Sequence, residues 1–328
     1  WTPAKMKEVE LLAEQIEARL QAIGDPKKLL FHGSGLLLLL PADEKRLQEL
    51  LSELLEADRL FLTLKKEAST LMMLETPNDQ ATYQVLIDHI KQATVSPSLD
   101  GFPIENSAWL NSKEEIGEAI KPGLRLSQLH AQYASVFIPE AWQQDLLLTR
   151  HYLLSHGRKW SKFLIGSYKN SVNQLGALLT VPIPKALDDK LKYVEAIMEA
   201  NRLSRTLESA TPLLKEIAGS NWQGLKSNWQ QLDQAFQFLS TTHSRLQSRS
   251  IHPNFLQYLR QAASPAMQAS ALLSQLNEAD TARKVMITSL FQTLRFEGEI
   301  SSLTDAQQTD KFYRWNEQLP ELHKAVQW

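Results

Sequence analysis

The chain has 328 residues, of which 43% are hydrophobic and 22% charged, so it holds enough apolar material for one large or two modest domains and does not have the composition of a disordered protein. It contains no Cys, which excludes disulfides, thiolate metal sites and cysteine nucleophiles. The formal net charge is only −2, so the charge must be compared segment by segment.

The residue types favour helices along the whole chain. There are 55 Leu and 26 Gln but only nine Val, and Leu and Gln suit helices whereas β-branched residues suit strands. The 12 Gly leave few positions for hairpin turns, and no stretch shows sustained alternation of apolar and polar residues. We therefore expect an all-α protein, an elongated multi-helix bundle with long antiparallel, coiled-coil-like helices.

Residues 1–95 are predicted to form an N-terminal helical arm. Thr2-Pro3 is typical of an N-cap followed by Pro in the first turn, and the helix should end at Ile23. A long helix is expected over 42–75, because its apolar residues follow the 3-4 spacing of a coiled-coil seam. The predicted seam consists of Leu47, Leu50, Leu54, Ala57, Phe61, Leu64, Ala68 and Leu71.

A third helix should begin at Thr76-Pro77 and end before a loop at 96–111, which contains Pro97, Gly101 and Pro103. The predicted buried face of this helix consists of Tyr83, Leu86, Ile87 and Ile90.

Residues 112–328 are predicted to form a helical bundle. Pro122-Gly123 should interrupt or kink its first helix, and Pro212 should kink or split a second long helix over 185–218. This helix is one candidate partner for the 42–75 helix, among several apolar stripes that could pair. The other expected helices lie at 124–137, 139–156, 167–179 and 227–247, with further starts near 253, 265 and 304, the last helix being bent at Pro320.

The charge is unevenly distributed. Residues 1–120 carry 12 basic and 20 acidic side chains, whereas residues 121–328 carry 23 basic and 17 acidic ones. The segment 146–187 contains no Asp or Glu, and neither does 234–277. Basic clusters with nearby aromatic residues can contact phosphates and stack on bases, although a solvated helix face that pairs with the acidic part of the chain is the simpler interpretation. The candidate nucleic-acid-binding residues are Arg150, Arg158, Lys159, Lys162 and Lys169.

Motifs for catalysis and cofactors are missing from the sequence. There is no phosphate-loop motif and no H-E-x-x-H, and the eight His do not pair with carboxylates at ligand spacing. We therefore predict no catalytic residues, no metal site and no cofactor. The longest apolar run, Leu36 to Leu40, is far too short for a membrane span, and no signal peptide is evident, so we expect no membrane contact and a cytoplasmic location.

One segment resembles a known group of proteins. The run from Gly219 to Leu232, GSNWQGLKSNWQQL, is similar to a "G-x-x-W-x-G-x-x-[ST]-[DN]-W-x-x-L" element in the helical inserted region of large bacterial superfamily 1 DNA helicases. Two shorter elements support the resemblance, which covers mainly residues 130–328: the W-x-x-F-L stretch at Trp160 and the terminal V-x-W at Val326. These helicases resemble restriction or phage-defence enzymes and often carry a very-short-patch-repair-like nuclease domain.

The resemblance implies an excised, non-catalytic accessory domain of an ATP-dependent DNA helicase. Such a domain would contact DNA or other domains of its parent protein. Four residues of the element are predicted to be structural, forming a helix–loop–helix corner: Trp222, Gly224, Trp229 and Leu232. The alternative is a protein–protein interaction scaffold that binds a partner helix, or a second copy of itself, through a heptad seam. A stand-alone helical enzyme would require a deep pocket with perturbed carboxylates or His.

Overall fold

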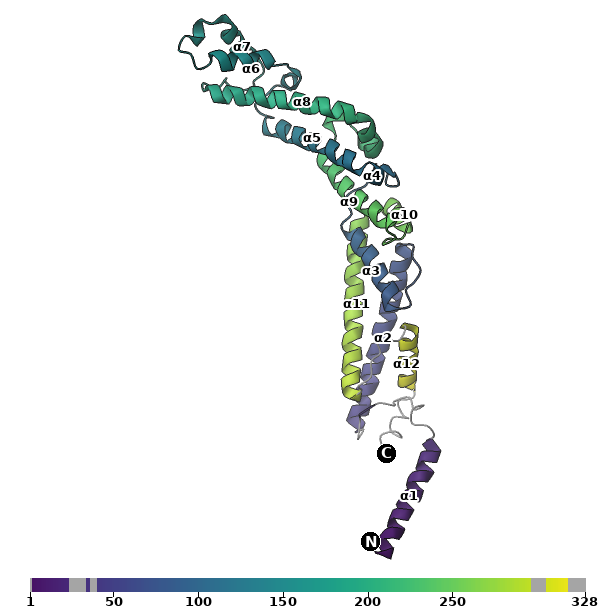
Figure 1. Cartoon of the computed structure of the whole chain (residues 1–328). Helices are drawn as coiled ribbons and strands as arrows, with labels where there is room; N and C mark the ends of the chain where they lie inside the picture. The colour runs from purple at the N-terminus through teal and green to yellow at the C-terminus, as the bar shows by residue number, and fades with distance from the viewer. Residues whose placement is uncertain (1, 24–33, 36–39, 296–304, 318–328) are drawn as a thin grey trace. The chain divides into compact units, whose positions relative to one another are not determined.

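The computed structural model describes residues 2–23, 34–35, 40–295 and 305–317 (Figure 1). These residues form helices and no β-strand, and an isolated antiparallel bridge joins Phe137 to Leu179. The chain is therefore all-α, as its composition predicts. The predicted elements at Leu36–Leu39, Pro320 and Val326–Trp328 lie outside the described residues.

The α-helices are α1 (Pro3–Ile23), α2 (Pro41–Leu71), α3 (Gln80–Thr94), α4 (Ala108–Asn111), α5 (Lys113–Gln132), α6 (Leu147–His156), α7 (Gly166–Ala177), α8 (Leu187–Ala218), α9 (Trp229–Gln247), α10 (Asn254–Gln261), α11 (Pro265–Leu294) and α12 (Asp305–Glu317).

The chain divides into two compact units. The first contains residues 1–94 and 267–328, and the second contains residues 95–266. This division differs from the predicted one, in which 112–328 formed a single bundle. The reason is that α11 and α12 supply core residues to α2, far away in the sequence.

The core of the first unit is a cluster of leucines and aromatic rings contributed by α2, α11 and α12. Its buried members are Leu47, Leu50, Leu51, Leu54, Leu290, Leu294, Phe312 and Trp315. Phe61 of α2 also meets Tyr83 of α3 edge to face, with ring centroids 5.4 Å apart. The predicted pairing of the 42–75 helix with the 185–218 helix is therefore not the packing found within this unit. The buried face predicted for α3 is confirmed at all four positions.

The seam of α2 differs from the predicted one at three of its eight positions. Leu47, Leu50, Leu54, Phe61 and Ala68 are buried as predicted, whereas Ala57 and Leu64 are only partly buried and Leu71 is 36% exposed. At each of these three positions the next residue is buried instead: Asp58, Lys65 and Met72, all at most 2% exposed. The apolar spacing favours Ala57 and Leu64 over their charged neighbours. The prediction therefore missed two charged residues, Asp58 and Lys65, that the structure buries.

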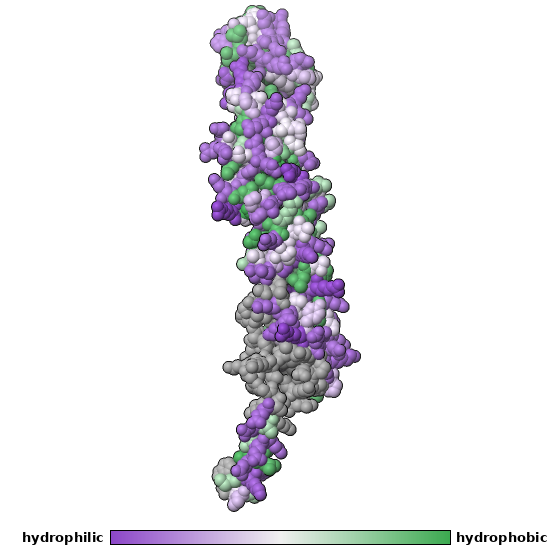
Figure 2. All heavy atoms as spheres, turned by 90° about the vertical axis from the view of Figure 1, so that its right-hand side faces the viewer, coloured by the Kyte–Doolittle hydropathy of each residue, from purple (hydrophilic) through white to green (hydrophobic). Residues whose placement is uncertain are grey.

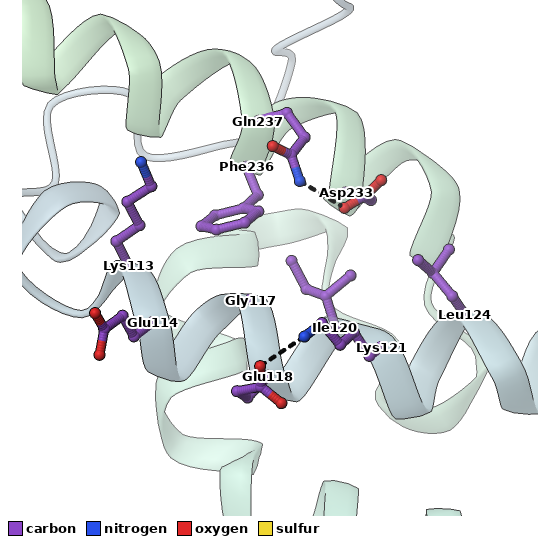
Figure 3. A pocket seen from close by; sticks show the side chains of 10 residues that line it. All are labelled: Lys113, Glu114, Gly117, Glu118, Ile120, Lys121, Leu124, Asp233, Phe236 and Gln237. Carbon is purple, nitrogen blue, oxygen red and sulfur yellow. Dashed lines mark hydrogen bonds and ion pairs between the residues drawn. The ribbon is translucent and has the colours of Figure 1, made fainter.

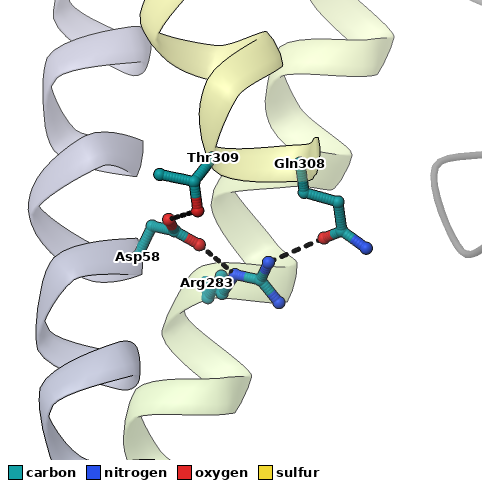
Figure 4. Close-up of polar contacts among 4 residues, drawn as sticks. All are labelled: Asp58, Arg283, Gln308 and Thr309. Carbon is teal, nitrogen blue, oxygen red and sulfur yellow. Dashed lines mark hydrogen bonds and ion pairs between the residues drawn. The ribbon is translucent and has the colours of Figure 1, made fainter. Parts of the chain in front are cut away.

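Asp58 can be buried because a polar network satisfies its carboxylate (Figure 4). Arg283 of α11 donates from Nε to Asp58 Oδ1 over 2.6 Å, and Thr309 of α12 donates its hydroxyl proton to Asp58 Oδ2 over 2.5 Å. Arg283 also donates to Gln308 Oε1 over 2.6 Å. A buried charge is tolerated when it is paired and hydrogen-bonded, and this network joins three helices of the first unit.

Every described side chain of α1 is exposed, including several large hydrophobic ones (Figure 2). Met6 is 60% exposed, Val9 53%, Leu12 57% and Ile16 49%. An isolated helix of this length is only marginally stable in water, so α1 is a helix whose apolar side chains gain little from packing within the described residues.

In the second unit, α5 packs against both α8 and α9. Pro122-Gly123 does not interrupt α5, and Pro212 does not split α8. Gly123 matters for the packing because a Cβ at this position would lie 2.1 Å from the ring of Trp229. The ring of Trp229 thus occupies the space that a side chain on α5 would need.

The predicted loop at 96–111 is part of the core of the second unit. Phe102 and Trp109 are buried, and the Trp109 indole donates to the Pro103 carbonyl over 2.9 Å. Gly101 has a φ of +80°, and its carbonyl accepts a hydrogen bond from the Ser220 amide at 3.2 Å. These contacts fix the segment against the turn that follows α8.

Candidate nucleic-acid interface

The acid-free segment 146–187 folds into α6, a turn, α7 and the connection to α8. Leu153 of α6 and Leu175 of α7 are fully buried, and the Thr149 hydroxyl donates to Gln174 Oε1 over 2.6 Å. A Cβ on Gly157 would lie 2.5 Å from the Leu187 side chain, so the end of α6 lies against the start of α8. The helix pair therefore presents residues 158–165 at one end of the second unit.

The turn places an aromatic ring in solvent between cationic side chains. Trp160 is 91% exposed, and Arg158 and Lys159, which precede it, are also exposed. The Lys159 ammonium lies 3.4 Å from His156 Nδ1, and no carboxylate of the described residues forms an ion pair with Arg158 or Lys159. Leu164, in the same turn, is 84% exposed. The indole of a tryptophan is usually buried and stabilises the fold by its apolar area. The ring of Trp160 is not used in this way, so it is available to stack on a ligand.

The remaining predicted site residues lie in different surroundings. Arg150 forms an ion pair with Glu195 of α8, with Nη2 and Oε1 3.4 Å apart. Lys162 donates from its ammonium to the Gly157 carbonyl over 3.2 Å. Lys169 is exposed on α7. The structure therefore brings Arg158 and Lys159 together beside Trp160 and gives Arg150 a carboxylate partner, so the five cations do not form one continuous row.

The prediction missed Lys190, which is buried near Lys162. Its ammonium donates to the Lys185 carbonyl over 2.9 Å, and burial lowers the pKa of Lys190, with the charge of Lys162 as a further cause. Lys190 follows Asp188 and Asp189 in the sequence, so a search for acid-free runs passes over it.

The four residues predicted to be structural form a corner between α8 and α9. The rings of Trp222 and Trp229 meet edge to face with centroids 6.0 Å apart, and Trp229 and Leu232 are 2% exposed. The indole of Trp229 donates to the Leu225 carbonyl over 3.2 Å. Gly224 has a φ of +62°, a conformation that suits glycine. This corner positions helices and presents no chemistry.

A cavity with a volume of about 550 Å³ lies between α5 and α9 (Figure 3). Its charges are mixed: the Lys121 ammonium lies 2.6 Å from Glu118, and Gln237 donates to Asp233 over 3.4 Å. Charged groups that satisfy one another in this way do not select a ligand of either sign, so we do not assign a function to this cavity.

No group of three or more His, Asp or Glu within the described residues could hold a metal ion. None of the described helices is both long and apolar enough to cross a membrane. Comparison of the chain with protein-family models, curated proteins and solved structures gives no match.

Proposed function

We propose that this chain is a non-catalytic helical accessory region that contacts DNA through the turn between α6 and α7. The observation that supports this most is the 91% exposed ring of Trp160 directly after Arg158 and Lys159, in a segment without acidic residues. Base stacking on an aromatic side chain contributes about 1–3 kcal/mol per base, and cations add a salt-dependent attraction to phosphates. The turn combines both.

The parent protein in this proposal is an ATP-dependent bacterial DNA helicase. Its support is the sequence resemblance around Trp222 and Trp229. In such a protein, α2 and α11 would form an antiparallel, coiled-coil-like arm, because Leu47 and Leu54 at one end of α2 share a core with Leu290 and Leu294, and Asp58 pairs with Arg283 further along both helices.

The proposal is tested by titrating a labelled single-stranded oligonucleotide with the whole chain at several salt concentrations. The double variant Arg158→Glu/Lys159→Glu should reduce the slope of log K against log salt by about 1.4, which corresponds to two phosphate contacts on a single strand. Trp160→Ala should weaken binding between about fivefold and 150-fold, as expected for one stacked base, while leaving the slope unchanged.

The matched control is Arg205→Glu/Lys215→Glu, which makes the same change of charge on exposed residues of α8. Its salt slope should stay that of the wild type. Absence of wild-type binding, or an equal loss of slope in the control, would show that the turn is not a DNA interface.

The alternative function, binding of a partner helix, is favoured by α1. The α2 seam predicted for that role is covered by α11 and α12, but Met6, Val9 and Ile16 of α1 are exposed at a 3-7 spacing. If α1 pairs with a second copy of itself, sedimentation velocity should show a dimer that Val9→Glu/Ile16→Glu converts to a monomer. A monomeric wild type would remove self-association.

A further inference from the structure

An open cavity of about 540 Å³ lies between α7, the connection that follows it and the start of α8, and three of its seven lining residues are lysines. Lys169 comes from α7, Lys185 from the connection and Lys190 from the first turn of α8, so three segments contribute one lysine each. No carboxylate is among the lining residues. A volume in this range is typical of pockets that bind small molecules.

Lys190 is the informative member of the cluster because it is only 6% exposed. A lysine is rarely buried unless its charge is compensated. Its ammonium has three donors, and the acceptor that the structure gives it is the Lys185 carbonyl at 2.9 Å. Burial and the nearby charge of Lys162 lower the pKa of Lys190. An anion in the cavity would offset both effects and accept the remaining donors.

The charges around the cavity favour an anion even when the nearest carboxylates are counted. Asp189 lies beside Lys190 and opposes the effect of Lys162 on its pKa, but its carboxylate is also 3.3 Å from the ammonium of Lys192. Asp188 precedes it in the first turn of α8 and is exposed. Three lysines therefore line the cavity and a fourth, Lys162, acts on Lys190, whereas two carboxylates lie at the start of α8 and one of them is already paired.

The other lining residues provide an apolar wall. Val172, Ile183 and Pro184 line the cavity with Tyr168, which is 4% exposed and whose pKa is raised by burial. A ligand that fits this surface has a strongly anionic group at one end and an apolar or planar part at the other.

We propose that this cavity binds a phosphate monoester, carried either by a free mononucleotide or by the 5′ end of a DNA strand. A phosphate monoester carries about −1.5 to −2 charges and three acceptor oxygens near pH 7, which suits a cavity lined by three lysines, one of them buried. The apolar wall would hold the nucleoside. This site is separate from the Trp160 turn, and its ligand could be bound whether or not that turn contacts DNA.

The test is isothermal titration calorimetry of the whole chain in phosphate-free buffer. The probes are adenosine 5′-monophosphate, adenosine, and a thymidine octamer with either a 5′-phosphate or a 5′-hydroxyl. We expect the phosphorylated member of at least one pair to bind about tenfold or more tightly than its unphosphorylated partner, since a hydrogen bond to a charged group contributes roughly that much. Preference in the first pair assigns a free nucleotide, and preference only in the second assigns a DNA end.

Variants show whether the binding takes place in this cavity. Lys169→Gln is on an exposed residue and should fold normally, and Lys190→Met keeps most of the buried volume; each should weaken the phosphorylated probe by about tenfold. Lys215→Gln is the matched control, because Lys215 is an exposed lysine of the same helix that does not line the cavity, and the affinity of this variant should be unchanged.

The proposal is overturned if neither phosphorylated probe binds better than its partner at millimolar concentration. It is equally overturned if Lys169→Gln leaves the affinity unchanged while the chain remains folded by circular dichroism. If Trp160→Ala and Arg158→Glu/Lys159→Glu bind the oligonucleotide like the wild type, the DNA interface at the turn is refuted. Binding of a phosphorylated probe in this cavity is unaffected by that outcome, so the two proposals are tested independently.

Discussion

Removal of the Asp58 carboxylate should destabilise the first unit strongly. Asp58→Ala deletes a charge-assisted hydrogen bond from Arg283 and a second hydrogen bond from Thr309, and it leaves a guanidinium whose side chain is 7% exposed without that carboxylate. Both bonds are charge-assisted because a carboxylate accepts them, and such bonds contribute about 1.5–3 kcal/mol each. Their sum, about 3–6 kcal/mol, overlaps the roughly 3–5 kcal/mol measured when one partner of a buried pair is removed. We expect a loss of about 3–4 kcal/mol.

The assay is native-state hydrogen exchange followed by mass spectrometry, because it resolves the two units. Amides of α2 and α11 should exchange about 100- to 1000-fold faster in Asp58→Ala, while α5 and α9 of the second unit keep their wild-type rates. The matched control is Asp310→Ala in α12, where the exposed Asp310–Arg314 pair is 3.0 Å apart and should contribute no more than about 0.5 kcal/mol.

A double substitution tests whether the loss of stability comes from an unpaired buried charge. Asp58→Leu/Arg283→Met removes both charges, so it should be less destabilising than Asp58→Ala, because no buried charge is left unpaired. Two results would contradict this account of the network. One is that Asp58→Ala lowers the free energy of unfolding no more than Asp310→Ala does, and the other is that the double variant is less stable than Asp58→Ala.

Two further predictions concern the second unit. Gly123→Ala places a Cβ 2.1 Å from the buried ring of Trp229 and should destabilise α5 and α9 by about 3 kcal/mol in the same exchange assay, whereas Gly166→Ala, which meets nothing within 4 Å, should be neutral or slightly stabilising. Burial lowers the pKa of His130 below its usual 6.5. As the pH falls, the imidazole is therefore protonated in the unfolded chain at a higher pH than in the folded chain. The free energy of unfolding should be insensitive to His130 above about pH 7 and decrease as the pH falls from 6.5 toward the folded-state value. His130→Gln should flatten urea-unfolding stability across that range, and identical pH slopes in both proteins would contradict the assignment.

Local features of the sequence were sufficient to predict most of the helices. Pro3 and Ile23 bound α1 as expected, and α9 ends at Gln247, because capping residues, prolines and glycines act within a few residues of the backbone they terminate. The periodicity of α3 also predicted four of its six buried side chains correctly. The interruption predicted at Pro122, as one of two alternatives, is not found, because packing stabilises a helix beyond its local propensity.

The candidate site was predictable in charge and not in geometry. The absence of acidic residues from 146–187 located the basic segment, and the sequence predicted Trp229 to be structural, but it did not show that Trp160 is 91% exposed whereas Trp229 is 2% exposed. Their fates differ because Trp229 meets a glycine on a neighbouring helix and Trp160 lies in a turn beyond the packed faces of α6 and α7.

By itself, therefore, the sequence determined an all-α chain without recognisable catalytic motifs, with a basic segment in its second half. Only the tertiary structure decided which charges are buried. Asp58 is acceptable in a seam because Arg283 and Thr309, 225 and 251 residues later, reach its carboxylate. Lys190 is buried where the connection after α7 returns to the start of α8. Burial of a charge depends on partners distant in the sequence, and periodicity within one helix carries no information about them.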